Sequence, residues 1–537
     1  MLLVNDRLSA EKRRDIAFLL LVAVAAFTVY VNSIGNGLVW DDTIVIIKNS
    51  ALRGEVLPLF SGIDSGRDVE LTPYYRPLTF LTFLIEGQLH GFNPFLMHLI
   101  NVLLHAVNAF LVYRLARALL NDALAALLAG LLFAVHPVHS EGVDFLSGGR
   151  NTMLACFFIL MACLAHRRSV IEGSRSCAFA GAAFFLAGLF SKEIAVSLLP
   201  FIVAIEITPL RGDPIQRRRA IIRLIPYAAC TLFYFTLRSN ALSFAGVQVA
   251  ILPGLGTRLL DNLYIIPRYL LTVIWPLSLG SKYFIPGDLH LLALPLVFGW
   301  LCVIVILGWV FMRGRSRATL FGLLWLAAFW LPVSGIIPIP SAPLADRYFY
   351  VPAIGLWIVV ADQAGRLFPP GVVSRRRAAF VASIILLVLA GLTVRRNLDW
   401  KSDITFFSRM VEQYPEKAFG HHNLGCAYLD KMKNLDLAEK EFEKALALDP
   451  AFPRLRTQMG YICLLRGDYA GALRHYSEAV KVNPFDAEAR LNSGTALERL
   501  GRYDEAVAEF RFFLAIPGNE LADSRPYAKA RVKELSK

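Results

Sequence analysis

The stretch IAFLLLVAVAAFTVYV (residues 16–31) follows the basic triplet Lys12-Arg13-Arg14 and contains no charged residue. A helix that crosses a bilayer needs about 20 mostly apolar residues, and the residues after Val31 extend this run toward that length. No small-x-small site closes the run, so it does not have the form of a cleavable signal peptide. We therefore predict an uncleaved first membrane span.

The rest of the chain shares this apolar character. Of its 537 residues, 56% are hydrophobic and 18% are charged, and the mean hydropathy is +0.51. Soluble domains are about 45–50% apolar and about a quarter charged. The apolar excess falls almost entirely before residue 400. This distribution excludes a wholly cytosolic enzyme, a collagen or coiled coil, and a disordered chain, and it leaves a polytopic membrane protein with a soluble tail.

Eleven apolar runs predict an all-α membrane bundle of about eleven spans. The runs lie near residues 16–34, 95–113, 123–141, 151–166, 177–191, 194–210, 221–238, 292–312, 319–338, 348–365 and 378–394. The segment 258–276 is also apolar but contains Arg258, Asp261 and Arg268. We interpret it as an in-plane or re-entrant helix on the outer surface, and a spanning helix stays the alternative.

The distribution of charge predicts the topology. The formal net charge is +13, yet residues 400–537 contain 21 Lys and Arg against 20 Asp and Glu, so the excess lies before residue 400. The excess basic residues cluster in short loops, as the positive-inside rule describes for cytoplasmic loops. This topology accounts for the positive charge better than a nucleic-acid partner does. We expect a cytoplasmic N-terminus and a tail on the opposite side. The clusters are Lys12-Arg13-Arg14, Arg114/Arg117, Arg167-Arg168, Arg217-Arg218-Arg219, Arg313/Arg315/Arg317 and Arg375-Arg376-Arg377.

The tail repeats itself every 34 residues. Ala438, Ala472 and Ala506 share this spacing, and an aromatic residue follows each by four positions. Gly425, Gly460 and Gly494 recur 35 and 34 residues apart. A helix–turn–helix unit of this length with small residues at fixed places is typical of tetratricopeptide repeats. We predict a membrane domain over 1–399 with a long outer loop at 35–94, and an extracytoplasmic α-solenoid over 400–537 with three repeats and a capping helix at 523–535.

Polar motifs at the outer ends of the apolar runs carry the candidate chemistry. Trp40-Asp41-Asp42 places two adjacent carboxylates just beyond the first span, where one could act as a general base; a helix N-cap is the alternative. Arg76 could bind phosphate oxygens or extend to the interface. The other such residues are His136, His139, Glu141, Arg150, Lys192, Glu193, Arg347 and Tyr348.

These motifs do not indicate a metal site or a nucleotide-binding site. His136 and His139 form a His-x-x-His pair without the further ligands of a zinc site. The seven cysteines include no CxxC pair, which favours small buried side chains over metal or disulfide chemistry. There is no Walker loop or dinucleotide fingerprint. No cofactor follows, and a divalent-cation requirement stays open. Carboxylates and several cations on one side of the membrane fit a phosphate ester held in lipid.

The ordered motifs, followed by the repeats, resemble those of the transmembrane and tetratricopeptide-repeat-containing O-mannosyltransferases. They are Trp40-Asp41-Asp42, Tyr75-Arg76-Pro77, His136-Pro137-Val138-His139-Ser140-Glu141, Gly149-Arg150, Ser191-Lys192-Glu193 and Asp346-Arg347-Tyr348-Phe349-Tyr350. The resemblance implies a GT-C glycosyltransferase fold that uses a polyprenyl-phosphate sugar on the lumenal or periplasmic face.

The same resemblance implies roles for single residues. Asp41 would be the catalytic base and Asp42 the next candidate. The lipid phosphate would be held by Arg76, Arg150, Lys192 and Arg347. The sugar or acceptor pocket would be lined by Trp40, His136, His139, Glu141, Glu193 and Tyr348. Asn151-Thr152 after Arg150 departs from the acidic residue expected there, which leaves the sugar and the acceptor open.

The expected activity is transfer of mannose or another hexose to Ser/Thr hydroxyls of a protein that the repeats bind. The chain length and compact loops suggest a bacterial protein in the cell inner membrane, with undecaprenyl phosphate as the donor carrier and periplasmic repeats. Two alternatives remain: a transferase that acts on a glycolipid or cell-wall polysaccharide, and a non-catalytic scaffold that recruits envelope proteins through its repeats.

Overall fold

The structure is a computed structural model. It describes residues 2–49, 52, 54–61, 74–207, 214–243, 254–280, 282–285, 294–312, 316–337, 344–369, 373–452, 454–517 and 521–536. These residues form helices and connecting turns with no strand among them, so the predicted all-α class is confirmed. The chain divides into two compact units, Met1–Ser402 and Asp403–Lys537.

Each of the eleven predicted apolar runs falls on a helix of the first unit. These helices are α1 (Leu2–Tyr30), α4 (Pro94–Leu119), α5 (Ala123–Val135), α7 (Leu146–Glu172), α8 (Arg175–Ser191), α9 (Leu198–Ile207), α10 (Pro214–Ser243), α12 (Leu294–Met312), α13 (Arg317–Trp330), α14 (Pro352–Leu367) and α15 (Val373–Asn397). Shorter helices lie between them, namely α2 (Val56–Ser61), α3 (Pro77–His90) and α6 (Ser140–Asp144).

Fewer helices than eleven meet the length and composition of a membrane span. Within the described ranges, five are long and apolar enough, namely α1, α4, α7, α10 and α15. A sixth results if α5 and the short helices up to Asp144, bent by 49°, count as one broken span. Helices α8 and α13 are apolar but shorter. The protein is thus a helical membrane protein, and the count of eleven spans is not confirmed.

Helix α11 (Leu255–Ile274) corresponds to the segment for which the sequence predicts an in-plane helix. It packs against α12 and does not meet the criteria for a span. Leu255, Leu259 and Leu260 on it are exposed, whereas Ile265 and Tyr269 are buried. An apolar exposed side next to a buried one suits a helix that lies along a membrane surface, so the in-plane orientation stays a prediction.

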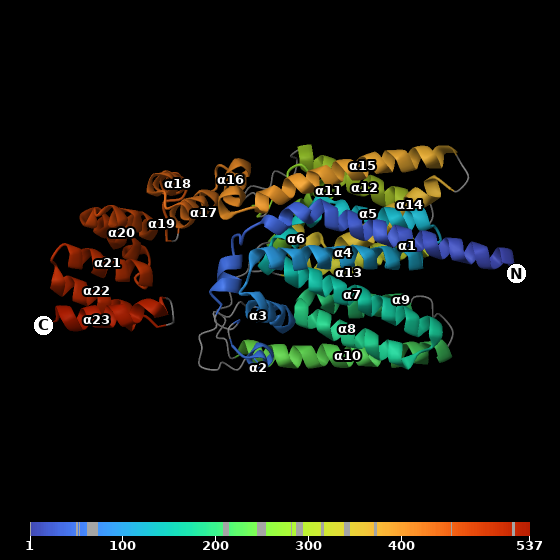
Figure 1. Ribbon diagram of the computed structural model, residues 1–537, viewed down its shortest axis with the longest axis horizontal. Coiled ribbons are helices and arrows are strands. Elements are labelled where there is room, and N and C mark those ends of the chain that lie inside the picture. Colours follow the sequence, from blue (N-terminus) through green and yellow to red (C-terminus); the bar gives the residue numbers. More distant parts are fainter. Residues whose placement is uncertain are drawn as a thin grey trace. The chain divides into compact units, whose positions relative to one another are not determined.

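The long helices of the first unit run alongside one another (Figure 1), and the two ends of this bundle differ in the residues that they carry. At one end, basic residues from the predicted cytoplasmic clusters bind partners from neighbouring helices. Arg117 pairs with Asp15 at 3.3 Å, and Arg375 pairs with Asp122 at 2.6 Å. Helices α2, α3 and α6 gather at the other end (Figure 1). Arg313 and Arg315 lie outside the described residues.

The second unit consists of paired helices. The pairs are α17 (Ala418–Ala427) with α18 (Leu435–Leu448), α19 (Leu455–Arg466) with α20 (Tyr469–Val482), and α21 (Ala487–Arg499) with α22 (Tyr503–Ala515); α16 (Asp403–Gln413) precedes them. The expected capping helix is α23 (Arg525–Leu535), which packs against α22. The extra residue of the first repeat is absorbed by a π-helical turn, Tyr428–Met432, and by Lys433 in a left-handed conformation (φ 53°).

The repeated glycines are explained by the aromatic residues that face them. A Cβ added to Gly425 would lie 2.5 Å from the ring of Phe442, and one added to Gly460 would lie 2.6 Å from that of Tyr476. Gly494 and Phe510 repeat this arrangement. The aromatic rings occupy the space that a side chain would need, so the two helices of each repeat approach closely. The predicted repeat is therefore confirmed at the level of side-chain packing.

Candidate active site

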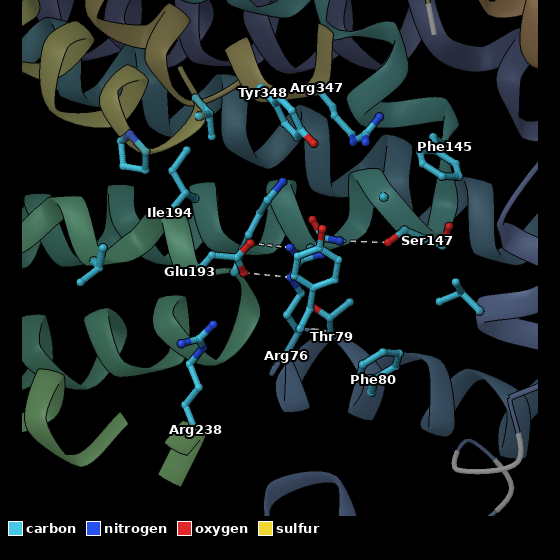
Figure 2. A pocket seen from close by; sticks show the side chains of 18 of the residues that line it. Arg76, Thr79, Phe80, Phe145, Ser147, Glu193, Ile194, Arg238, Arg347 and Tyr348 are labelled. Carbon is cyan, nitrogen blue, oxygen red and sulfur yellow. Dashed lines mark hydrogen bonds and ion pairs between the residues drawn. The ribbon is translucent and has the colours of Figure 1, made fainter. Parts of the chain in front are cut away.

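A cavity of about 500 Å³ opens at the end of the first unit opposite the basic clusters. Several elements that are distant in sequence line it: the loop after α1, the start of α3, the first turns of α7, the break between α8 and α9, helix α10, and the turn before α14 (Figure 2). Six of the residues singled out from sequence line this cavity, namely Asp41, Arg76, Lys192, Glu193, Arg347 and Tyr348.

Asp41 lies in a tight turn that Trp40 helps to hold. Trp40 adopts a left-handed backbone conformation (φ 58°), which is strained for a bulky residue. Its ring stacks on Phe145 with a centroid distance of 5.3 Å, and Phe145 stacks on Trp400 at 5.6 Å. Trp40 is not among the residues that line the cavity. It supports the turn that points Asp41 into the cavity.

The loop before Asp41 is also fastened to the last residues of the first unit. The amide of Gly37 donates to the carbonyl of Lys401 at 3.0 Å, and the side-chain amide of Asn36 donates to the carbonyl of Asn397 at 3.2 Å. Trp400 is fully buried. The position of Asp41 thus depends on residues more than 350 positions away in sequence.

The ionisation of Asp41 depends on its surroundings in two opposite ways. Burial raises the pKa of the Asp41 carboxyl above its ordinary value, because it penalises the charged form. The positive charges of Arg347 and Lys282 act in the other direction and lower that pKa. A carboxylate with a raised pKa next to cations can accept a proton from a bound hydroxyl.

Asp42 is placed differently from its neighbour. Its side chain is fully buried and accepts hydrogen bonds from the backbone amides of Ser147 at 2.8 Å and Val39 at 3.2 Å. Burial raises the pKa of Asp42 to about 7 in spite of these bonds. Asp42 is not a lining residue, and it ties the Asp41 turn to the first turn of α7.

Arg76 and Glu193 form a two-bonded ion pair on one wall of the cavity (Figure 2). The Arg76 Nη2 atom lies 2.5 Å from Oε1 of Glu193, and Nε lies 3.0 Å from Oε2. The guanidinium also lies 4.1 Å from the centroid of the Tyr74 ring. These contacts fix the plane of the guanidinium, whose remaining donor groups are available for a ligand.

Lys192 ends helix α8, since its backbone is extended (φ −161°, ψ 141°) and the following residues form a short 3-10 helix. Its Nζ atom donates to Oγ1 of Thr152 at 2.7 Å and lies 5.5 Å from the centroid of the Tyr348 ring. The Lys192 side chain is almost completely buried. The break in the helix therefore delivers a cation to the cavity wall.

Arg347 is held by Glu141, which is buried and lies outside the lining. The Arg347 backbone amide donates to Oε2 of Glu141 at 2.8 Å, and its Nη1 atom pairs with Oε1. The guanidinium lies 5.5 Å from the centroid of the Phe145 ring. Glu141 is thus placed to orient Arg347 and does not face the cavity itself.

Three other residues singled out from sequence lie outside the cavity lining. Arg150 is buried among α3, α4 and α7, where it pairs with Glu86 and donates to the carbonyl of Met97 at 3.0 Å. His136 contacts the Val273 carbonyl at 3.0 Å. His139 packs on the ring of Phe133 with a centroid distance of 4.6 Å. Their visible contacts are with the protein interior.

The cavity also contains residues that sequence reasoning missed, notably Thr79, Ser147, Asn151, Tyr234 and Arg238. Arg238 lies near the end of α10. From sequence alone, an arginine at this position cannot be distinguished from one whose side chain extends to the membrane interface. Its guanidinium projects from α10 toward the wall that carries Glu193 and Ile194 (Figure 2). Among the residues described, no cluster of three His, Cys, Asp or Glu side chains suits a metal ion.

Both units of the chain match models of known protein families. The family model of dolichyl-phosphate-mannose-protein mannosyltransferases matches residues 77–243. This range includes helix α3, which begins directly after Arg76, together with Lys192 and helix α10. Tetratricopeptide-repeat models match residues 420–452 and 464–517.

Similar curated proteins share the combination of the two units. Protein O-mannosyl-transferase F38B6.6 of Caenorhabditis elegans is 27% identical over 83% of this chain and 65% of its own length. Protein O-mannosyl-transferase TMTC3 of Mus musculus is 26% identical over 95% of this chain and 57% of its own length. Protein O-mannosyl-transferase TMTC3 of Homo sapiens is 25% identical over 92% of this chain and 55% of its own length. The chain thus spans between 55 and 65% of the length of these relatives.

Proposed function

Because the chain belongs to the family of protein O-mannosyltransferases that carry tetratricopeptide repeats, we propose that it transfers mannose to protein hydroxyls. The donor in this proposal is a polyprenyl-phosphate mannose, and the acceptor is a Ser or Thr hydroxyl of a polypeptide. The observation that carries the proposal is the convergence of Asp41, Arg76, Lys192 and Arg347 on one cavity.

Asp41 is the general base of the proposed reaction. It is the lining carboxylate without a two-bonded arginine partner, whereas Glu193 is occupied by Arg76. Its raised pKa makes it a better proton acceptor than an exposed aspartate. As the acceptor oxygen attacks C1 of the sugar, its proton passes to Asp41, and the bond between C1 and the phosphate oxygen breaks.

The cations serve the other side of the reaction. When the C1–O bond breaks, negative charge develops on the phosphate, and donors that are already in place stabilise it without reorganisation. Arg76 and Arg347 are each fixed by a carboxylate, and Lys192 by Thr152. Removal of one such donor typically costs about 2.7–4 kcal/mol of transition-state stabilisation.

Residues that do not line the cavity support this arrangement. Asp42 and Trp40 hold the Asp41 turn, and Glu141 holds Arg347. We propose that the repeats bind the acceptor polypeptide, as such solenoids commonly bind partners. The cavity end of the bundle faces the non-cytoplasmic side, in a cell inner membrane with a cytoplasmic N-terminus and periplasmic repeats. This placement rests on the basic clusters at the other end.

The test is transfer by the purified full-length protein in lipid, with polyprenyl-phosphate mannose and a Ser/Thr-rich peptide, read out by release of lipid phosphate and by mass of the peptide. Asp41→Asn should reduce transfer about 100- to 10,000-fold, the usual contribution of a general base, without a change in thermal unfolding. Asp261→Asn, a carboxylate on α11 outside the cavity lining, is the matched control and should retain wild-type transfer. Near wild-type transfer by Asp41→Asn would show that the base is wrongly assigned.

A further inference from the structure

Positive side chains outnumber carboxylates in the cavity. The lining contains four cations and two carboxylates, namely Arg76, Lys192, Arg238 and Arg347 against Asp41 and Glu193. Lys282 acts on Asp41 from outside the lining, and Glu141 pairs with Arg347. With these two included the count is five against three, so the surplus of two positive charges is unchanged.

Arg238 is the lining arginine that contributes most directly to this surplus. Arg76 and Arg347 each have a carboxylate partner. Within the described part of the chain, no carboxylate lies at ion-pair distance from Arg238. It is partly exposed and projects into the cavity from α10 (Figure 2). A half-buried guanidinium without an anionic partner is suited to bind an anion.

The proposed reaction moves negative charge within the cavity. Before transfer, the phosphodiester donor carries one negative charge and Asp41 carries another. After transfer, Asp41 is protonated, and the leaving group is a phosphomonoester with about −1.5 to −2 charges at neutral pH. The total is conserved, so the lining and its ligand together carry the same net charge before and after transfer, but the negative charge now lies on the phosphate. Cations that contact the phosphate therefore interact more strongly with the product than with the donor.

We propose that Arg238 is a binding residue for the polyprenyl monophosphate leaving group, and that it distinguishes this phosphomonoester from the phosphodiester donor. The inference rests on the proposed function. Phe235, which lies one turn before Arg238 on α10, is exposed and also lines the cavity. A phosphate at Arg238 thus lies beside an exposed apolar side chain, along which the polyprenyl chain extends toward the bilayer.

The experiment compares binding of two lipids to the full-length protein in nanodiscs, without acceptor and therefore without turnover. The probes are polyprenyl monophosphate and polyprenyl-phosphate mannose. Arg238→Gln should weaken binding of the monophosphate about 10- to 100-fold, the range of one hydrogen bond between charged groups. Binding of the mannosyl phosphodiester should fall by a clearly smaller factor. Arg238→Lys should keep most of the preference, because it keeps the charge.

Two further comparisons make the result decisive. Arg218→Gln, an exposed arginine at the opposite end of α10, is the control and should bind both lipids like the wild type. From pH 5 to 7.5, monophosphate binding by the wild type should strengthen as the phosphate loses its second proton near pH 6, and Arg238→Gln should show a smaller rise. Equal losses for both lipids, or no loss, would overturn the role of Arg238 alone. A wild-type protein that binds neither lipid would overturn the proposed function as well.

Discussion

Substitution of Gly149 by alanine should disturb the cavity from a distance. Gly149 lies in the first turns of α7, where α6 crosses, and a Cβ there would lie 2.1 Å from the carbonyl oxygen of Gly142 and 2.7 Å from its carbon. Ordinary contact begins near 3.4 Å, so α6 and α7 would have to separate by about 1.3 Å. The obstacle is backbone and cannot rotate away. Helix α6 carries Glu141, which holds Arg347.

The expected magnitude follows from these distances. Overpacking of this kind costs about 1–3 kcal/mol, and alanine regains up to about 1 kcal/mol of helix propensity over glycine. We therefore expect the free energy of unfolding to fall by about 1–2 kcal/mol. Transfer should fall more, because a shift of about 1 Å in a positioning group can reduce the rate about 100-fold.

The assay is thermal unfolding in detergent together with transfer from polyprenyl-phosphate mannose to a peptide. Gly391→Ala on α15 is the matched control, since a Cβ there meets no atom within 4 Å; its stability should be unchanged or slightly higher. If Gly149→Ala unfolded like the wild type and gave transfer within about twofold of it, the close crossing of α6 and α7 would not matter to the site, and Glu141 would not control the position of Arg347.

Two other substitutions test the electrostatics. The proposed mechanism needs ionised Asp41, so the rate of transfer should fall as the pH drops through the raised pKa of Asp41. Lys282→Met removes a charge that lowers this pKa, so the acid limb of kcat/KM should move to higher pH. An unmoved limb would exclude Lys282 as a neighbour of the proposed base. Arg150→Met leaves Glu86 buried without its partner and should destabilise the protein by about 3–5 kcal/mol. The donor KM of the fraction that folds should change little. A raised donor KM with unchanged thermal unfolding would instead support a phosphate-binding role for Arg150.

The helices and repeats could be predicted because their signals are local. Apolar runs of sufficient length mark helices regardless of their partners, and the recurrence of small and aromatic residues at spacings of 34 or 35 predicted paired helices in the tail. The number of spans could not be read in the same way. Helices α8 and α13 are apolar yet shorter than a bilayer requires, and an apolar run in sequence does not show where the helix within it ends.

The site was only partly predictable, because residue type does not reveal which way a side chain points. Arg76 and Arg150 look equivalent in sequence, yet Arg76 lines the cavity and Arg150 is buried against Glu86 and Asn101. Asp41 and Asp42 are adjacent, but a turn at Trp40 sends one into the cavity and the other to the amide of Ser147. Arg238 was missed because α10 brings it to the cavity only through packing against α8 and α9.

The attachment of Gly37 to Lys401 has a practical consequence for anyone who wishes to express the membrane unit alone. A truncation after residue 399, where composition changes, would discard both the carbonyl that receives this bond and the indole of Trp400 that supports Phe145. Ending the polypeptide after Ser402 retains both. Three residues at the junction thus separate a fragment with both of its bonds to this loop from one in which only the bond between Asn36 and the Asn397 carbonyl remains.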